Sequence, residues 1–310
     1  MPLIAMIDRL IEKIMEMKNP TVAGLDPKLD YVPEAMKQAA FKEYGETFEG
    51  AAQAILAFNR ELIDALCDIV PAVKPQAAYY EMYGVPGIAC MQETIRYAQL
   101  KGMYVILDAK RGDIGATSEA YAKAYLGETA IGVQEIPAYG ADCMTVNPYL
   151  GTDGVKPFTE QCAKHQKGIF VLVKTSNPSS GELQDLKVKG KCIYEHVAEL
   201  VKGWGSDLIG QYGYSSVGAV VGATYPEQAE ALRAQMPHTY FLVPGYGAQG
   251  GKAEDVAKSF NPDGLGAIVN ASRSIMCAYQ KQGGTPGDAA RAEAIRMRDD
   301  IMGAVDKKSL

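Results

Sequence analysis

The amino-acid sequence predicts an α/β protein: a single (β/α)8 TIM barrel with an extra N-terminal helix and long βα loops. Eight short apolar segments alternate with helical patterns along the 310 residues, and this alternation is typical of parallel βαβ units. Eight such units favour a closed barrel over an open sheet. No internal repeat, linker or low-complexity run divides the chain, so we expect residues 1–310 to form one domain.

The chain begins with a predicted helix. Its apolar residues share one helical face: Ile7, Leu10, Ile11, Ile14 and Met15. Asp8 and Arg9 interrupt this stretch, so it lacks the continuous apolar region of a signal peptide. No window of the sequence approaches the roughly 18 apolar residues of a membrane span. We therefore expect a cytoplasmic protein that does not bind membranes.

The eight predicted strands are short apolar runs bounded by turn residues. They are Thr21–Asp26, Pro71–Ala78, Met103–Lys110, Cys143–Tyr149, Gly168–Ser176, Ser216–Thr224, Tyr240–Gly247 and Gly266–Arg273. The second is the weakest because prolines disfavour central strands.

Helical patterns separate the predicted strands and close the chain. They cover Ala51–Asp68, Ile88–Leu100, the Ala- and Tyr-rich segment from Asp113 to Gly127, Val155–Lys164, Cys192–Leu208, Glu227–Gln235, Ala253–Ser259 and Asp288–Val305. Two long connections, Pro27–Gly50 and Asn177–Lys191, are expected to be polar loops.

Charge and cysteine usage exclude several classes of function. A formal net charge of −6 argues against a general nucleic-acid or membrane-surface binder, although it allows a local basic pocket. The six cysteines include no C-x-x-C pair, and the three histidines are far apart. The sequence therefore predicts neither a disulfide framework nor a metal site.

The third strand delivers a charged array at its end. The apolar run beginning at Val105 ends in Asp108, Ala109 and Lys110, and a turn then leads to Asp113. Residues two apart on a strand point to the same side, so Asp108 and Lys110 should project together. An alternative is that these charges form only a salt-bridged strand end.

This array favours one kind of chemistry. Carboxylates on both sides hold Lys110 as an ammonium, which disfavours a Schiff-base role. It favours a cation that stabilises developing negative charge and then donates a proton. Asp108 would repel a carboxylate brought beside it. The array therefore suits decarboxylation, in which the carboxylate leaves and Lys110 protonates the resulting carbanion.

Polar residues also gather at the other strand ends, where barrels place their sites. Asp26 ends strand one, Lys74 lies on strand two, and Asn270 and Arg273 end strand eight. Arg273 and the glycine-rich segment Gly245–Gly251 are expected to bind a phosphate. The alternatives are a turn-capping Asp26, a surface Lys74 with an apolar stem, and a glycine-rich segment that is only a surface turn.

The third-strand pattern Asp-x-Lys-x-x-Asp-Ile-x-x-Thr consists of Asp108, Lys110, Asp113, Ile114 and Thr117. It resembles the signature of the orotidine 5′-phosphate decarboxylase family, and the long connections resemble a longer subgroup of that family. The resemblance implies decarboxylation of orotidine 5′-phosphate to uridine 5′-phosphate and CO2, the last step of de novo pyrimidine nucleotide synthesis. It implies a barrel that uses no metal or organic cofactor.

The resemblance implies a catalytic network of Lys74, Asp108, Lys110 and Asp113, in which Lys110 stabilises and protonates a carbanion at C6 of the substrate. It also implies a homodimer in which Asp113 and Thr117 reach into the partner's site.

The same resemblance implies the substrate contacts. Asp26 and Lys74 would contact the ribose hydroxyls, and Ser176, in a Thr-Ser-Asn-Pro run, would recognise the base. Gln249 would bridge phosphate and base, and Arg273 would bind the phosphate. We expect Asn270 to contact the substrate as well. No role is assigned to three further polar residues near strand ends: Gln76, Asn147 and Asn177.

Three other functions are compatible with parts of the pattern. Related sugar-phosphate decarboxylases and synthases share Asp-x-Lys-x-x-Asp, and a metal-assisted member would need a divalent cation. A Schiff-base aldolase would use Lys110 as a nucleophile, which the flanking carboxylates disfavour. A catalytically silent barrel that binds a phosphate ligand is the third alternative.

Overall fold

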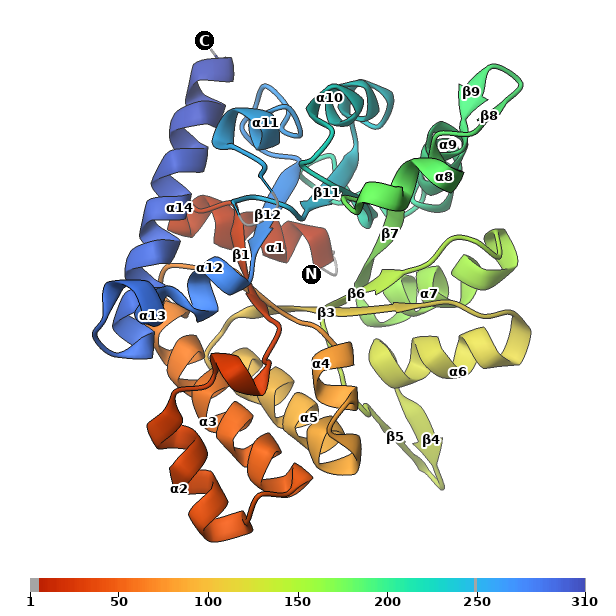
Figure 1. The fold of residues 1–310 in the computed structure, drawn as a ribbon. Helices are drawn as coiled ribbons and strands as arrows, with labels where there is room; N and C mark the ends of the chain where they lie inside the picture. Colours follow the sequence, from red (N-terminus) through yellow and green to blue (C-terminus); the bar gives the residue numbers. More distant parts are fainter. Residues whose placement is uncertain (1–5, 248–249, 310) are drawn as a thin grey trace.

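A computed structural model describes residues 6–247 and 250–309, and its central feature is a closed barrel of eight parallel strands (Figure 1). The barrel strands are β1 (Thr21–Leu25), β2 (Ala72–Pro75), β3 (Tyr104–Arg111), β6 (Cys143–Val146), β7 (Gly168–Lys174), β10 (Ser215–Val221), β11 (Thr239–Val243) and β12 (Ala267–Ala271). Each lies in a predicted strand segment or overlaps one. They close in the order β1-β12-β11-β10-β7-β6-β3-β2. The predicted (β/α)8 barrel is confirmed.

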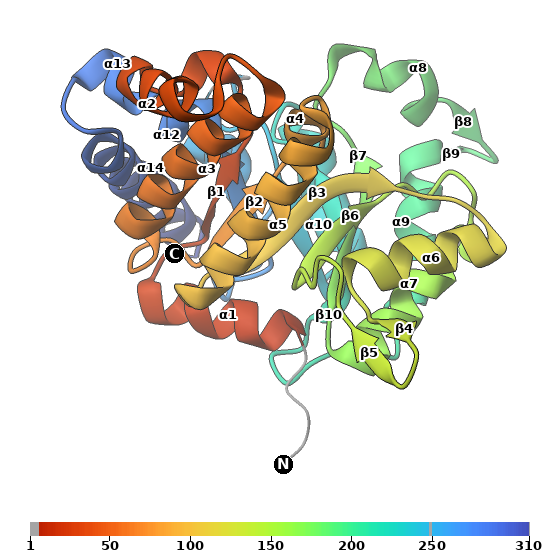
Figure 2. The same cartoon turned by 90° about the horizontal axis from the view of Figure 1, so that it is seen from below.

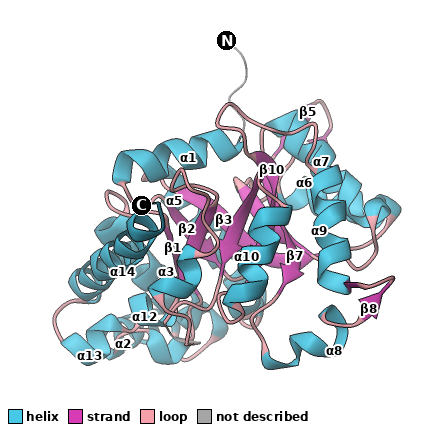
Figure 3. Ribbon diagram, turned by 90° about the horizontal axis from the view of Figure 1, so that it is seen from above, coloured by secondary structure: helices cyan, strands magenta, loops and turns pink. Residues whose placement is uncertain are grey.

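Helices surround the strands on the outside, as Figure 3 shows by colour. The longer ones are α1 (Met6–Met17), α2 (Glu34–Tyr44), α3 (Phe48–Leu66), α5 (Gly84–Leu100), α6 (Gly115–Tyr125), α7 (Thr152–His165), α9 (Ile193–Trp204), α10 (Pro226–Gln235) and α14 (Pro286–Ser309). Short ones are η1 (Leu29–Tyr31), α4 (Ala78–Glu81), η2 (Pro178–Ser180), α8 (Gly181–Gln184), α11 (Ala253–Ala257), α12 (Arg273–Met276) and α13 (Ala278–Gln282).

The N-terminal helix α1 closes the end of the barrel where the strands begin, below the strands in Figure 2. Its apolar face packs on barrel-interior side chains, including Tyr104 and Phe170. Asp8 on this helix is buried and accepts hydrogen bonds from the backbone N–H groups of Gln211 and Tyr212, at 3.0 and 3.3 Å. These contacts close that end, so a ligand site must form at the other.

The strands are buried on both sides, as expected of a parallel sheet covered by helices. Along β3, Ile106 points into the barrel interior, whereas Val105 and Leu107 join the layer packed under the helices. The apolar runs seen in the sequence therefore correspond to strands without a solvent-facing side.

Two connections differ from their predictions. Pro27–Gly50 was expected to be a polar loop, but it contains η1 and α2. None of the residues of α2 is fully buried, and Met36 and Ala40 pack only partly against the core, so the apolar periodicity that indicates a helix is weak there. The other connection, Asn177–Lys191, contains η2, α8 and the first strand of a hairpin formed by β8 (Lys187–Val188) and β9 (Lys191–Cys192).

A second small hairpin lies between α6 and β6, where no element was predicted. Its strands are β4 (Thr129–Ile131) and β5 (Gln134–Ile136), which pair antiparallel and are exposed throughout.

Among the described helices, none combines the length and the apolar character that crossing a membrane requires.

Candidate active site

A cavity of about 610 Å3 opens where the barrel strands end. Its apolar floor comes from three strands: Leu172 of β7, Val220 of β10 and Leu242 of β11. Most of the predicted site residues line its polar walls: Asp26, Lys74, Asp108, Lys110, Ser176, Asn270 and Arg273.

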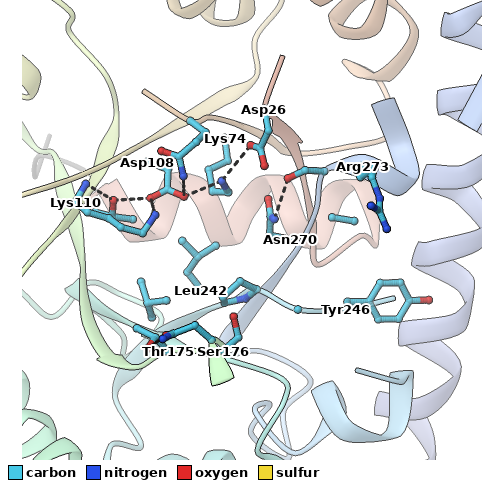
Figure 4. Close-up of a pocket in the computed structure, with 18 of the residues that line it drawn as sticks. Asp26, Lys74, Asp108, Lys110, Thr175, Ser176, Leu242, Tyr246, Asn270 and Arg273 are labelled. Atoms are coloured by element: carbon cyan, nitrogen blue, oxygen red, sulfur yellow. Dashed lines mark hydrogen bonds and ion pairs between the residues drawn. The ribbon is translucent and has the colours of Figure 1, made fainter. Parts of the chain in front are cut away.

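A row of alternating charges follows one wall of the cavity (Figure 4). Lys74 Nζ lies 3.7 Å from Asp26 Oδ1 and donates a 2.9 Å hydrogen bond to Asp108 Oδ2. The other oxygen of Asp108 accepts a 2.5 Å hydrogen bond from Lys110 Nζ. Asp108 and Lys110 therefore project together, as the sequence predicts. Lys74 is only 4% exposed, so its interpretation as a surface lysine is wrong.

Asp108 also accepts two hydrogen bonds from neutral side chains. Gln76 Nε2 donates to its Oδ2 at 2.9 Å, and Thr145 Oγ1 donates to its Oδ1 at 2.8 Å. Asp108 is 6% exposed, and its carboxylate has four side-chain donors in all: Lys74, Gln76, Lys110 and Thr145. Both oxygens are held in place, and the group cannot turn away from a ligand.

The charges in the row stabilise one another. Burial alone would raise the pKa of Asp108, but the neighbouring Lys74 and Lys110 outweigh it and hold that pKa well below its usual value. Burial alone would lower the pKa of Lys74, but Asp108 and Asp26 outweigh it and raise that pKa. At neutral pH the cavity therefore presents an ionised Asp108 carboxylate bonded to the Lys74 ammonium.

The pairing of β3 with β6 is irregular around Lys110. Leu107 pairs with Met144 and Arg111 with Val146, so the intervening segment of β3 is longer than the segment of β6 opposite it. Such bulges redirect side chains beside functional sites. Within this bulge Lys110 has φ +49°, a left-handed conformation that costs a non-glycine residue about 1–2 kcal/mol.

The structure does not bring Asp113 and Thr117 into the cavity. Both come after the end of β3, Thr117 on α6. The Asp113 carboxylate accepts a 2.8 Å hydrogen bond from the backbone N–H of Ile114, and Thr117 is exposed. Neither lines the cavity. Of the predicted charged network, one chain therefore assembles Lys74, Asp108 and Lys110.

Arg273 lies at the opposite end of the cavity from Lys110 (Figure 4). It starts α12 directly after β12, and its side chain is exposed. Beside it lie Gly245 and Tyr246 of the glycine-rich segment, and Tyr246 Oη donates a 2.5 Å hydrogen bond to Asp300 Oδ2 on α14. This end therefore carries a cation for an anionic group. The predicted residue Gln249 lies outside the described residues.

Two buried acceptors face the middle of the cavity. Among the described residues, no hydrogen-bond donor reaches Asn270 Oδ1, and Asp26 Oδ1 is paired only with the Lys74 ammonium at 3.7 Å, beyond hydrogen-bond distance. Buried polar atoms are normally satisfied, so unpaired ones in a cavity indicate positions where a ligand supplies the donor. The Asp26 side chain faces Lys74 and the cavity and makes no turn-capping hydrogen bond within the described chain. Its interpretation as a turn cap is therefore wrong.

The wall opposite the charged row is formed by the segment after β7. Thr175, Ser176 and Asn177 line the cavity there. Gln184 holds this backbone: its Oε1 accepts from Thr175 N at 3.0 Å, and its Nε2 donates to Thr175 Oγ1 at 2.7 Å. Thr224 Oγ1 donates to the carbonyl oxygen of Ser176 at 3.3 Å.

The charge of Lys174 is buried beneath this segment. Lys174 ends β7, is fully buried, and donates to Asp185 Oδ1 at 2.7 Å. It also donates to Ser180 Oγ at 3.3 Å, and its ammonium lies 4.6 Å from the Tyr225 ring centroid. The contact with Asp185 ties the end of the barrel strand to the loop that carries Ser176.

Several lining residues carry little signal in the sequence. Thr145 on β6 was not singled out, although it contacts both the carboxylate of Asp108 and the backbone N–H of Lys110. Its only sequence signal is a hydroxyl within the strand run CMTV, one position before the strand ends. Tyr31 and Tyr79 were also missed. They precede or follow strands by several residues, so strand-end reasoning does not reach them.

The described residues contain no group of three or more His, Cys, Asp or Glu side chains arranged to hold a metal ion. The described lining of the cavity includes three basic side chains: Lys74, Lys110 and Arg273.

Fold and site together define a class of protein: a (β/α)8-barrel enzyme that holds a lysine–carboxylate row at one end of its cavity and a cation for an anionic group at the other. The model of the "Orotidine 5'-phosphate decarboxylase / HUMPS family" matches residues 53–284. The chain belongs to this family, and the resemblance inferred from the signature around Asp108 is confirmed.

Individual relatives agree. Orotidine 5′-phosphate decarboxylase of Rhodopirellula baltica is 44% identical over 297 residues, which cover 94% of this chain and 96% of the relative. The protein of that name from Clostridium tetani is 40% identical and covers 98% of this chain and 100% of its own length. A solved structure of Leishmania donovani OMP decarboxylase has a TM-score of 0.72 at 30% identity, covering 97% of this chain and 99% of that one.

Proposed function

We propose that this protein decarboxylates orotidine 5′-phosphate to uridine 5′-phosphate and CO2. The observation that carries the proposal is the ionised Asp108 beside the Lys110 ammonium, in a cavity that presents Arg273 at its far end. Relatives that carry the name of this activity cover nearly the whole chain at 40–44% identity. A substrate with a carboxylate at one end and a phosphate at the other matches this charge distribution.

The chemical step follows from the two neighbouring charges. The substrate carboxylate at C6 lies against Asp108, and repulsion between the two anions raises the energy of the bound substrate. The bond between C6 and the carboxylate breaks, CO2 leaves, and the electron pair stays on C6, where the Lys110 ammonium stabilises it. Lys110 Nζ then transfers a proton to C6 and regains one from solvent.

The remaining lining residues orient the substrate. The Asp26 carboxylate and the Asn270 side-chain oxygen accept hydrogen bonds from ribose hydroxyls, and Lys74 fixes Asp26 and Asp108 from behind. Ser176 lies on the opposite wall, where it contacts the pyrimidine ring. Arg273 binds the phosphate, and Gln249 joins it from the glycine-rich segment.

The protein acts as a homodimer in this proposal, with residues 1–310 forming one decarboxylase domain. Asp113 and Thr117 lie outside the cavity of their own chain, and Ile114 between them is 58% exposed. Tyr149, in the next connection, is 79% exposed. An apolar, exposed surface around the second aspartate of the signature is suited to contact a second copy. We further propose a cytoplasmic enzyme that needs no cofactor.

The test is the fall in ultraviolet absorbance of orotidine 5′-phosphate on mixing with purified protein in EDTA, beside a Lys110→Ala variant. We expect rapid loss of signal with the parent and none with the variant. Turnover that appears only with added Mg2+ and sugar phosphates would contradict the proposal. It would instead favour the metal-assisted branch that shares Asp-x-Lys-x-x-Asp.

A further inference from the structure

Arg111 follows Lys110 in the chain, and its guanidinium donates to two side chains and one backbone carbonyl outside the cavity. Its Nε donates to Tyr125 Oη on α6 at 3.1 Å, and its Nη2 donates to the carboxylate of Glu81 on α4. Its Nη1 donates to the carbonyl oxygen of Ala109 at 3.0 Å. One guanidinium group therefore joins two surrounding helices to the backbone just before Lys110.

The bond to Ala109 spans Lys110, because its donor and acceptor belong to the residues on either side. Two other bonds hold the same short segment: Lys110 N donates to Thr145 Oγ1 at 2.9 Å, and Asn147 N donates to the carbonyl oxygen of Arg111 at 2.9 Å. The backbone is thus fixed before, at and after Lys110.

These bonds matter because the backbone of Lys110 has a left-handed conformation, with φ +49°. A lysine leaves that conformation readily unless its surroundings impose it. A change of φ at Lys110 would turn its Cα–Cβ bond relative to Asp108 and disturb the 2.5 Å contact between the two side chains. Arg111 is well suited to impose the conformation, since its guanidinium is planar and lies against the rings of Tyr121 and Tyr125, 5.9 and 5.6 Å from their centroids.

We propose that Arg111 is a positioning residue, which holds the left-handed backbone of Lys110 and thereby places Lys110 Nζ at the reacting carbon. The inference rests on the proposed function, in which Lys110 stabilises and protonates the carbanion. Arg111 does not line the cavity, so its effect on the reaction passes through Lys110.

The kinetic test compares Arg111→Met with Arg96→Met. Methionine keeps an apolar stem beside the tyrosine rings but has no donor for Ala109, and Arg96 is an exposed arginine on α5 paired with Glu93. We expect Arg111→Met to lower kcat about a hundredfold while KM changes less than about threefold, because a misplaced catalytic group loses rate without losing substrate binding. Arg96→Met should match the parent.

Two kinetic outcomes would overturn the inference: an unchanged kcat, or a rise in KM that accounts for the whole effect. If Arg111→Met does not fold, Arg111→Lys decides. It keeps the charge near the rings, but a single ammonium cannot hold Glu81, Tyr125 and Ala109 with the fixed geometry of the guanidinium. Restoration of the parent kcat by lysine would also contradict the inference.

A second readout separates this inference from the proposed function. Lysines are labelled by reductive methylation with 13C-formaldehyde, and the Lys110 signal is assigned by its loss in Lys110→Ala. We expect Arg111→Met to shift this signal and Arg96→Met to leave it unchanged. If the parent does not turn over orotidine 5′-phosphate, the proposed function fails, but the shift still supports the positioning role. An unshifted signal in a folded Arg111→Met protein excludes it.

Discussion

Asp108 is the residue on which the other charges of the site depend. It is the hydrogen-bond partner of Lys74 at 2.9 Å and of Lys110 at 2.5 Å, and without it the nearest carboxylate oxygen to Lys74 is that of Asp26 at 3.7 Å. Lys74 is 4% exposed, so its charge cannot turn to solvent. A group placed for catalysis is therefore also a structural partner of a buried cation.

We expect Asp108→Asn to abolish turnover and to lower the free energy of unfolding by about 3 kcal/mol, since it leaves a buried ammonium without its main partner. Urea unfolding followed by circular dichroism measures the second effect. Asp64→Asn, which removes an exposed partner of Lys101, should change stability by less than about 1 kcal/mol. Equal effects in the two variants would show that the Asp108–Lys74 pair contributes no special stability.

The lowered pKa of Asp108 implies that the stability of the protein depends on pH. The pKa of Asp108 is lower in the folded protein than its ordinary value of 3.8, so the folded state favours the ionised form. Its contribution is fully present above that value and is lost as the pH falls through the depressed folded pKa. The stability difference between the parent and Asp108→Asn should therefore shrink as the pH is lowered below about 4. A constant difference down to the acid limit of folding would contradict this.

Arg273 illustrates how a residue far from the reacting carbon can control the rate. Its guanidinium forms no hydrogen bond or ion pair with the described residues and lies at the far end of the cavity from Lys110. We expect Arg273→Ala to lower kcat/KM for orotidine 5′-phosphate about 10- to 100-fold, the range for a lost hydrogen bond between charged groups. Orotidine, which lacks the phosphate, is the control substrate. Equal losses on both substrates would place Arg273 elsewhere in the mechanism.

At the scale of elements, the strands were predictable and their distortions were not. The apolar runs around β3, β7, β10 and β12 indicated buried strands because both faces of a covered parallel strand are apolar. The bulge around Lys110 depends on the pairing of β3 with β6, which the sequence of β3 alone does not reveal. Helix α2 was missed because it fully buries none of its residues.

Some residues of the candidate site could likewise be predicted from the sequence, and others could not. Residues at strand ends, such as Asp26, Lys74 and Arg273, could be found because parallel barrels collect those ends around one opening. Thr145 and Tyr79 could not, since their place in the cavity depends on local packing. Gln76 was noticed without a role, and the structure places it as a donor to Asp108 at 2.9 Å.

The segment after β7 gives an element-scale prediction, because its position depends on Asp185. Asp185→Asn removes the charged partner of the fully buried Lys174 and should lower the melting temperature and raise KM several-fold, with a smaller change in kcat. The reason is that a looser segment displaces Ser176 rather than Lys110. Glu182→Gln, an exposed change on the short helix α8 that ends just before Asp185, is the control. A fall in kcat alone would contradict this separation of roles.

For the whole molecule, the barrel separates stability from chemistry. One end is closed by α1 through apolar packing and the bonds of Asp8, and the other carries the cavity. The charged side chains of the site therefore gather at the open end, opposite α1, and the closed end takes no part in binding. This division leaves Asp113 and Thr117 at the rim, on a surface that includes the exposed side chain of Ile114.

The proposed homodimer leads to a prediction that depends on the assembly of two chains. Each site would use Lys110 of one chain and Asp113 of the other, so Lys110→Ala and Asp113→Ala homodimers should both be nearly inactive. A mixed dimer would hold one site with both residues mutated and one site with both intact. Random exchange of subunits in an equal mixture should therefore restore about a quarter of the parent activity per chain.

Sedimentation analysis of the two variants establishes whether they are dimers, and activity is followed after mixing until exchange is complete. The matched control is a mixture of Lys110→Ala with Lys110→Arg, which cannot create a site with an intact Lys110 and should stay inactive. If Asp113 serves only its own chain, no mixed dimer contains a complete site and mixing restores nothing. Restored activity therefore distinguishes a shared site from two independent sites that merely sit side by side.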